Sequence, residues 1–127
     1  MNTVTLLKRN VIFNMKNMFS IIWFITILFS QNNNSEFRAT WVITWDWINP
    51  DDNAEEIRDK IRTKLDNHAA ANMTSVLFQI RQSGTAYYNS SYEPWGYYAN
   101  YNNPGFDPLA FAVEEAHQRG LELHAWF

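Results

Sequence analysis

The last eight residues, GLELHAWF (Gly120–Phe127), combine a helix-ending glycine with seven residues that predict a β-strand. Successive side chains of a strand point to opposite faces of its sheet. One face of this strand would be apolar, whereas the other would carry Glu122, His124 and Trp126. The two faces are therefore expected to lie in different surroundings.

Two earlier segments predict strands with the same asymmetry. Residues 37–45 (FRATWVITW) and 74–81 (TSVLFQIR) are rich in β-branched and aromatic side chains. Each segment has one apolar side and one side that becomes polar towards its C-terminal end. We expect the polar sides to be Thr40, Val42, Thr44 and Asp46 in the first strand, and Leu77, Gln79 and Arg81 in the second.

Two helices are predicted between the three strands. The first, residues 53–71, repeats apolar side chains every four positions and can be capped by Asp51 or Asp52. The second begins at Asp107-Pro108, where an acid can cap the helix and proline suits its first position. Strands that alternate with helices predict right-handed crossovers and a parallel sheet. The apolar positions are Ile57, Ile61, Leu65 and Ala69 in the first helix, and Leu109, Ala112, Val113 and Ala116 in the second.

The predicted fold class is α/β, and the polar strand faces bear on its architecture. An open doubly wound sheet is covered by helices on both faces, whereas a TIM (β/α)8 barrel has helices outside and a lumen inside. Polar residues on one side only favour the barrel; the alternative is an ordinary α/β sheet with a partly wet polar side. A barrel takes eight strands in about 250 residues. We therefore expect residues 36–127 to be the first three strands and two helices of a truncated barrel.

Composition excludes several kinds of site. Of the 127 residues, 46% are hydrophobic and 18% charged, which permits a packed core. The absence of cysteine excludes disulfides, thiolate metal sites and a cysteine nucleophile. Beyond Ser30 there are seven basic and thirteen acidic residues, which disfavours nucleic acid as a partner. The histidines, His68, His117 and His124, lack metal-ligand spacing, so we expect no metal, and no motif predicts a cofactor.

Residues 1–35 have the pattern of an export signal with a polar linker. The uncharged apolar run Met18–Phe29 follows Lys8, Arg9 and Lys16 and precedes an asparagine-rich stretch. A membrane-spanning helix needs about 20 apolar residues, more than this run provides. We predict export to the periplasm, the cell surface or the medium. An uncleaved N-terminal anchor, which would be the protein's sole contact with a membrane, and a buried helix are the alternatives.

Three stretches form an ordered set: FRATWVITWDW (37–47), SVLFQIRQSGTAYYNSSYEPW (75–95) and GFDPLAFAVEEAHQRGLELHAWF (105–127). This set resembles the start of the glycosyl hydrolase-like 10 family, and the resemblance covers nearly all of residues 36–127. It implies an exported bacterial protein with a TIM-barrel catalytic domain that hydrolyses glycosidic bonds in a cell-wall or related glycan. In that family the pattern continues with Asn-Pro and a later acidic strand end. Neither is present, so we expect the catalytic acids to lie beyond Phe127.

Glycoside hydrolysis commonly uses two carboxyl groups that flank the scissile bond. Asp46 follows the first strand, at the end of a barrel that carries the active site, and Glu93 lies in a long aromatic loop. Both are candidate catalytic residues, although Asp46 could instead cap the following turn. Glu122 begins the last strand, and we expect it to be a structural partner of a basic residue such as Arg38.

Four strand residues are candidate substrate contacts. Gln79 can donate to and accept from sugar hydroxyls, and Arg81 offers a planar fork to a carboxylate. His124 could donate to a sugar or tune a catalytic acid, and Trp126 could stack on a sugar ring. The alternatives are a buried ion pair for Arg81, a satisfied core histidine and a packed indole.

The loop at residues 82–106 contains all six tyrosines and Trp95. A loop of this length in a compact domain is usually functional. Tyr88 and Trp95 are our candidate glycan contacts within it, and the alternatives are packing over the barrel mouth or a protein interface. The sequence thus predicts part of a glycoside hydrolase. The competing hypotheses are a non-catalytic glycan-binding barrel and a fragment that neither folds nor binds.

Overall fold

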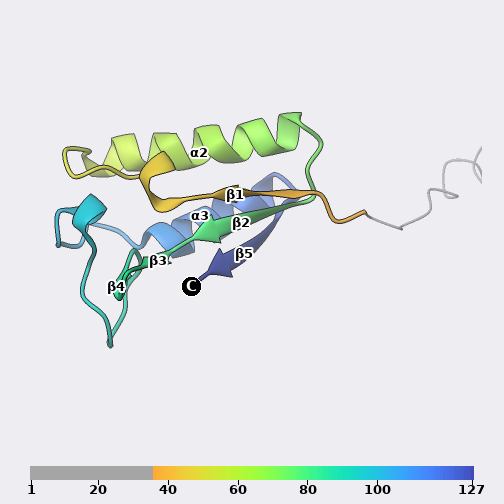
Figure 1. Ribbon diagram of the computed structural model, residues 1–127. Coiled ribbons are helices and arrows are strands. Elements are labelled where there is room, and N and C mark those ends of the chain that lie inside the picture. Colours follow the sequence, from red (N-terminus) through yellow and green to blue (C-terminus); the bar gives the residue numbers. More distant parts are fainter. Residues whose placement is uncertain (1–35) are drawn as a thin grey trace, which may run out of the picture. The chain divides into compact units, whose positions relative to one another are not determined.

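The computed structural model describes residues 36–127, so the export signal predicted in residues 1–35 lies outside the described part. Three strands form a parallel sheet in the order β1-β2-β5 (Figure 1), which confirms the α/β class with a parallel sheet. None of the described helices is long and apolar enough to cross a membrane. The elements are β1 (Ala39–Val42), the 3-10 helix η1 (Thr44–Asp46), α2 (Ala54–Ala70), β2 (Ser75–Gln79), β3 (Arg81–Gln82), β4 (Thr85–Ala86), the 3-10 helix η2 (Tyr97–Ala99), α3 (Pro108–Gln118) and β5 (Glu122–Trp126).

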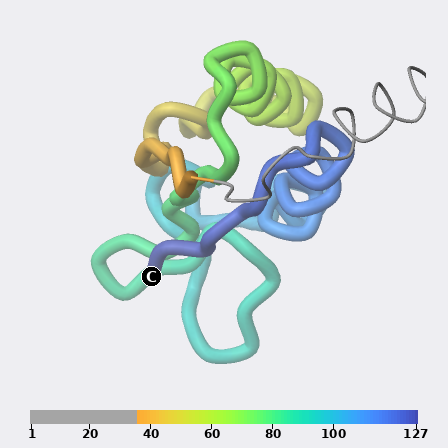
Figure 2. The backbone as a smooth tube through the Cα atoms, turned by 90° about the vertical axis from the view of Figure 1, so that its right-hand side faces the viewer, coloured from red at the N-terminus to blue at the C-terminus, as the bar shows by residue number. Residues whose placement is uncertain are grey.

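Both long helices pack on the same face of the parallel sheet, side by side (Figure 2). The opposite face has no cover among residues 36–127, and Trp41 on it is 60% exposed. Much of the core therefore lies between the sheet and the two helices, and residues of the η1 turn and the long loop extend it. Its buried members include Val42, Val76, Phe78 and Ile80 from or beside the strands, and Ile57, Ile61, Leu65, Ala112 and Ala116 from the helices.

The first strand is shorter than the predicted segment 37–45, and the assignment of its two sides was wrong. Thr40 Oγ1 lies 2.7 Å from Nε2 of His68 on α2, and Val42 is buried. The side expected to be polar thus faces the helices, while Trp41 lies on the uncovered face. A threonine beneath a helix is tolerated because the helix supplies it with a hydrogen-bond partner.

The N-terminus of α2 is capped by Asn53 rather than by Asp51 or Asp52. Asn53 Oδ1 accepts from the backbone N–H groups of Glu55 and Glu56, and Glu56 Oε2 accepts from the N–H of Asn53. This reciprocal arrangement is a capping box. Asp52 instead accepts from the N–H of Asn49 and pairs with Lys60.

The last turn of α2 buries His68, whereas the predicted Ala69 is exposed. An apolar face that repeats every four residues drifts away from the core, because a turn contains 3.6 residues. The His68 ring is satisfied on both sides, since Nδ1 lies 2.7 Å from the carbonyl oxygen of Lys64 and Nε2 contacts Thr40. Since a carbonyl oxygen only accepts, Nδ1 is the donor in its contact with Lys64.

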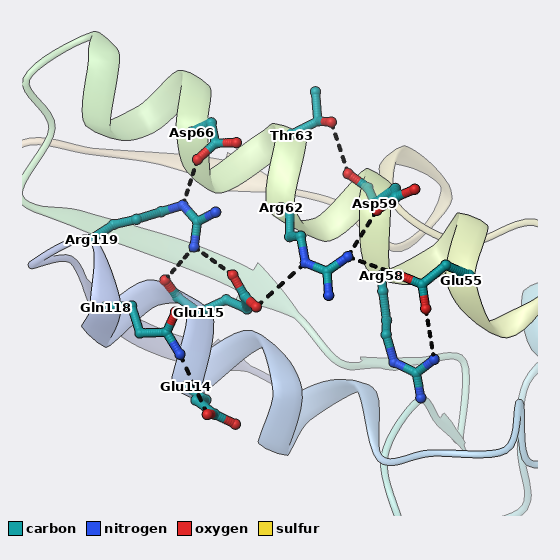
Figure 3. A network of polar contacts seen from close by, with 10 residues as sticks. All are labelled: Glu55, Arg58, Asp59, Arg62, Thr63, Asp66, Glu114, Glu115, Gln118 and Arg119. Carbon is teal, nitrogen blue, oxygen red and sulfur yellow. Dashed lines mark hydrogen bonds and ion pairs between the residues drawn. The ribbon is translucent and has the colours of Figure 1, made fainter.

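Helix α3 begins and ends as predicted. Asp107 Oδ1 accepts from the N–H groups of Leu109 and Ala110, and Pro108 occupies the first helical position. Gly120 follows the helix with a φ of +70°, a conformation that favours glycine. Charged side chains join α3 to α2 across their outer surface (Figure 3): Arg62 pairs with Glu115, and Arg119 pairs with Asp66. Arg119 also pairs with Glu115 of α3 itself.

Candidate functional site

The carboxyl ends of β1, β2 and β5 meet at one edge of the sheet, which we call the carboxyl edge. The η1 turn and the long loop between β2 and α3 both start there (Figure 1). Ligands of parallel α/β proteins bind outside this edge of the sheet. Five of the eight predicted site residues lie at it or beside it: Gln79, Arg81, Tyr88, Glu93 and Trp126.

Arg81 and Glu93 form a two-point ion pair at the carboxyl edge. Nε of Arg81 lies 2.7 and 2.8 Å from the two carboxylate oxygens of Glu93, and Nη2 lies 2.6 Å from Oε1. The guanidinium hydrogen bonds lower the pKa of the Glu93 carboxyl below its ordinary value. Glu93 also raises the pKa of Arg81. Glu93 is therefore a carboxylate at neutral pH, able to accept hydrogen bonds and unsuited to donate a proton.

Gln79 ends β2 and is 8% exposed. Its Oε1 accepts from the backbone N–H of Thr44 at 3.0 Å and from the Thr44 hydroxyl at 3.1 Å. These two bonds start the η1 turn, which explains why the chain leaves the sheet after Val42. The Nε2 amide group of Gln79 has no hydrogen-bond partner in residues 36–127, so it remains a donor at the carboxyl edge.

The open face of the sheet carries aromatic side chains. Trp126 is the register partner of Gln79, and its ring meets that of Trp41 edge-on at 4.8 Å. His124 lies in the middle of β5, where its Nε2 is 3.2 Å from Glu122 Oε2. Trp126 is therefore close to Gln79, whereas His124 lies further from the carboxyl edge.

The expected pairing of Glu122 with Arg38 was wrong. Arg38 bonds instead to Glu36 and to the carbonyl oxygen of Asn72, while Glu122 contacts His124 on its own strand. Residues two positions apart on a strand share a face, which brings the carboxylate to the imidazole.

Of the predicted residues, Asp46 and Trp95 lie outside the group at the carboxyl edge. Asp46 ends η1, and its carboxylate lies 3.8 Å from Nζ of Lys64 on α2, towards the helices. Trp95 forms an isolated β-bridge with Ala86 and is partly buried against the core. Tyr88 meets the Phe127 ring edge-on at 6.3 Å. Asp46 and Glu93 therefore belong to different ion pairs, with Lys64 and Arg81 respectively.

The long loop also forms a pocket that sequence reasoning did not identify. None of the eight predicted residues lines it, although the density of tyrosines between positions 82 and 106 marks the right segment. Residues 36–127 contain no group of three or more histidine, aspartate or glutamate side chains that could hold a metal ion.

A family model and two curated relatives that match this chain all carry the description glycosyl hydrolase or glycosyl hydrolase-like. The family model described as glycosyl hydrolase-like 10 matches residues 36–127. "Glycosyl hydrolase YngK" of Bacillus subtilis is 38% identical over 112 residues, which covers 81% of this chain and 22% of the relative. "Glycosyl hydrolase DigH" of Escherichia coli K12 is 33% identical over 112 residues, which covers 77% of this chain and 26% of the relative. The chain thus spans about a quarter of the length of these relatives.

Proposed function

Because the chain belongs to the glycosyl hydrolase-like 10 family, we propose that it forms the first three strands of a TIM-barrel glycoside hydrolase. Its substrate would be a cell-wall or related polysaccharide, reached by export through the N-terminal segment. The observation that carries the proposal is the sheet with helices on one face only. Its open face and carboxyl edge hold Trp41, Trp126 and the free amide of Gln79.

The order of the strands supports a barrel wall. Strand order β1-β2-β5 follows the order in the chain, and both crossover helices lie on one face. A barrel is built from successive steps of this kind, whereas a doubly wound sheet reverses its strand order and places helices on both faces. Further strands would extend the sheet from β5 until its open face becomes the lumen.

The side chains at the carboxyl edge have distinct roles in this proposal. Gln79 donates to a sugar hydroxyl through Nε2, and the Trp126 ring packs against the apolar face of a sugar. Arg81 keeps Glu93 ionised, so Glu93 orients hydroxyls or a neighbouring acid rather than protonating the leaving oxygen. The proton donor and its partner carboxylate lie on later strands, beyond Phe127.

A non-catalytic glycan-binding barrel is the second candidate. One observation favours it: both candidate carboxylates of residues 36–127 are engaged by cations, Glu93 by Arg81 and Asp46 by Lys64. A binding protein needs the aromatic and amide groups of the site and no pair of carboxyl groups at glycosidase spacing.

The deciding experiment reads the gene beyond the Phe127 codon and assays its whole product on purified cell-wall glycan. We expect further strand–helix units with a strand that ends in carboxylates, and release of new reducing ends. Arg81→Ala should lower that release at least tenfold, since it frees Glu93. The variant should lower the melting temperature by no more than about 5 °C, because the pair is partly exposed.

Two results would contradict the hydrolase. If a stop codon ends the reading frame before such a strand is encoded, the gene product has no catalytic acids. A complete product that binds glycan and releases no reducing ends supports the binding protein instead. If Arg81→Ala loses activity and stability equally, Arg81 is a structural residue.

A further inference from the structure

A pocket of about 310 Å³ lies within the loop between β2 and α3, next to the β3–β4 hairpin. This volume is at the lower end of the range for ligand pockets, about 300–1,000 Å³, and suits a single small ring. Four of the seven lining residues are tyrosines, and none of the seven is charged. They are Gln82, Ser83, Thr85, Tyr87, Tyr97, Tyr98 and Tyr101.

The floor of the pocket is fixed by close packing. Tyr87 is 1% exposed, and its ring contacts Trp47 in the core edge-on. A Cβ atom at Gly96 would overlap the hydroxyl end of Tyr87 and would lie 2.6 Å from Thr85 Oγ1. Gly96 is therefore required by the close approach of these side chains, and the floor is formed before any ligand arrives.

The hairpin that forms one wall has a defined turn. Ser83 and Gly84 have φ angles of +50° and +76°, as a two-residue type I′ turn requires. The Thr85 hydroxyl donates to the carbonyl oxygen of Gln82 at 2.8 Å, which closes the turn. The uncharged groups of Gln82 and Ser83 are thus held at the pocket by backbone geometry.

The rim of the pocket exposes aromatic surface. Tyr97 is 57% exposed and Tyr101 is 65% exposed, and their rings meet at 6.2 Å. On the other side, Tyr98 lies 6.2 Å from the ring of Trp45, which is 46% exposed on η1. The aromatic surface therefore continues from the pocket to the turn that follows β1.

We propose that this pocket binds one uncharged pyranose ring of a glycan, as a subsite separate from the Arg81–Glu93 pair. A pyranose has apolar C–H faces for the tyrosine rings and hydroxyls for the amide and hydroxyl groups of the walls. The proposal deepens the proposed glycan-directed function and rests on it for the ligand class. The lining supplies no charge to an acidic sugar, and the acidic chain beyond Ser30 disfavours a nucleotide.

The test measures binding of three tetrasaccharides to the full chain by isothermal titration calorimetry. Cellotetraose and chitotetraose are uncharged and distinguish plain from N-acetylated rings, whereas tetragalacturonate is acidic. We expect at least one uncharged probe to bind and the acidic probe not to bind. Tyr97→Ala should weaken that binding about tenfold, because it removes an exposed ring from the rim.

Tyr92→Ala is the matched control, since Tyr92 belongs to the same loop, is 97% exposed and does not line the pocket. Its affinity should equal that of the wild type. Tyr101→Ala replaces Tyr97→Ala if the latter does not fold. Equal binding of tetragalacturonate, wild-type affinity in both rim variants, or no binding of any probe by folded wild-type chain would each overturn the proposal.

Hydrolysis is measured separately, so the two proposals fail independently. If the whole gene product cleaves no glycan while binding still depends on Tyr97, the result counts against the hydrolase alone. Cleavage of glycan without Tyr97-dependent binding counts against the pocket alone.

Discussion

At the scale of single residues, Arg81 and Glu93 form a close ion pair at the carboxyl edge. Arg81 contacts both oxygens of Glu93 through its planar guanidinium, whose geometry suits two-point contact with a carboxylate. The side chain of Glu93 is only 22% exposed, so its hydrogen bonds to Arg81 replace part of its hydration. The pair therefore presents a fixed carboxylate rather than a titrating one over the neutral pH range.

This pairing predicts a pH dependence. The pKa of Glu93 is lower in the folded protein than its ordinary value of 4.5. The unfolded state thus binds the proton more readily, so the pair stabilises the fold above pH 4.5 and its contribution is lost as the pH falls below that value. At pH 7 the melting temperature of Glu93→Gln should be lower than that of the wild type. The difference in melting temperature should shrink as the pH falls below 4.5.

Thermal unfolding of both proteins across this range, monitored by circular dichroism, checks the prediction. Glu114→Gln is a suitable control, because Glu114 contacts only Gln118 and no cation among the described residues. If the difference in melting temperature between Glu93→Gln and the wild type stays constant from pH 7 to pH 3, the pair does not titrate as described.

At the scale of elements, local signals predicted α3 better than β1. Asp107, Pro108 and Gly120 act within their own turns, and the structure has each in the expected role. The two sides of β1 depend on distant partners, because Thr40 meets His68 and Trp41 meets Trp126. Alternation in a strand reveals that two faces exist, and only the tertiary contacts decide which one faces the helices.

The cap of α2 gives a prediction at this scale. Asn53 satisfies two backbone N–H groups, and Glu56 returns a bond to the backbone of Asn53. Asn53→Ala should lower the free energy of unfolding by about 1 kcal/mol. Asp51→Ala should change it far less, because the described contacts give the Asp51 side chain no hydrogen bond. Urea denaturation of the three proteins measures both effects, and equal losses would place the cap elsewhere.

At the scale of the whole molecule, the sheet has one face covered by helices and one face without cover among residues 36–127 (Figure 2). The helices bury the covered face, and the ion pairs between α2 and α3 lie on the outer surface of the helices (Figure 3). The second face exposes Trp41, and the half-buried Trp126 packs against it, an arrangement that a solvent-facing sheet rarely keeps. The sequence singles out the candidate residues on this side one by one, and their contact with a glycan stays a prediction. Their grouping could not, because the Arg81–Glu93 contact and the tyrosine pocket depend on how the long loop folds back.

The barrel proposal predicts that the open face becomes enclosed in the complete gene product. Trp41 would then lie in the lumen, while Tyr92, 97% exposed on the loop, would stay in solvent. Hydroxyl-radical footprinting with mass spectrometry measures both residues, each normalised to its own rate in the denatured protein, which removes the intrinsic difference between indole and phenol. We expect strong protection of Trp41 and almost none of Tyr92. Protection of Trp41 as weak as that of Tyr92 would mean that no further strands close over this face, and the barrel would have to be given up.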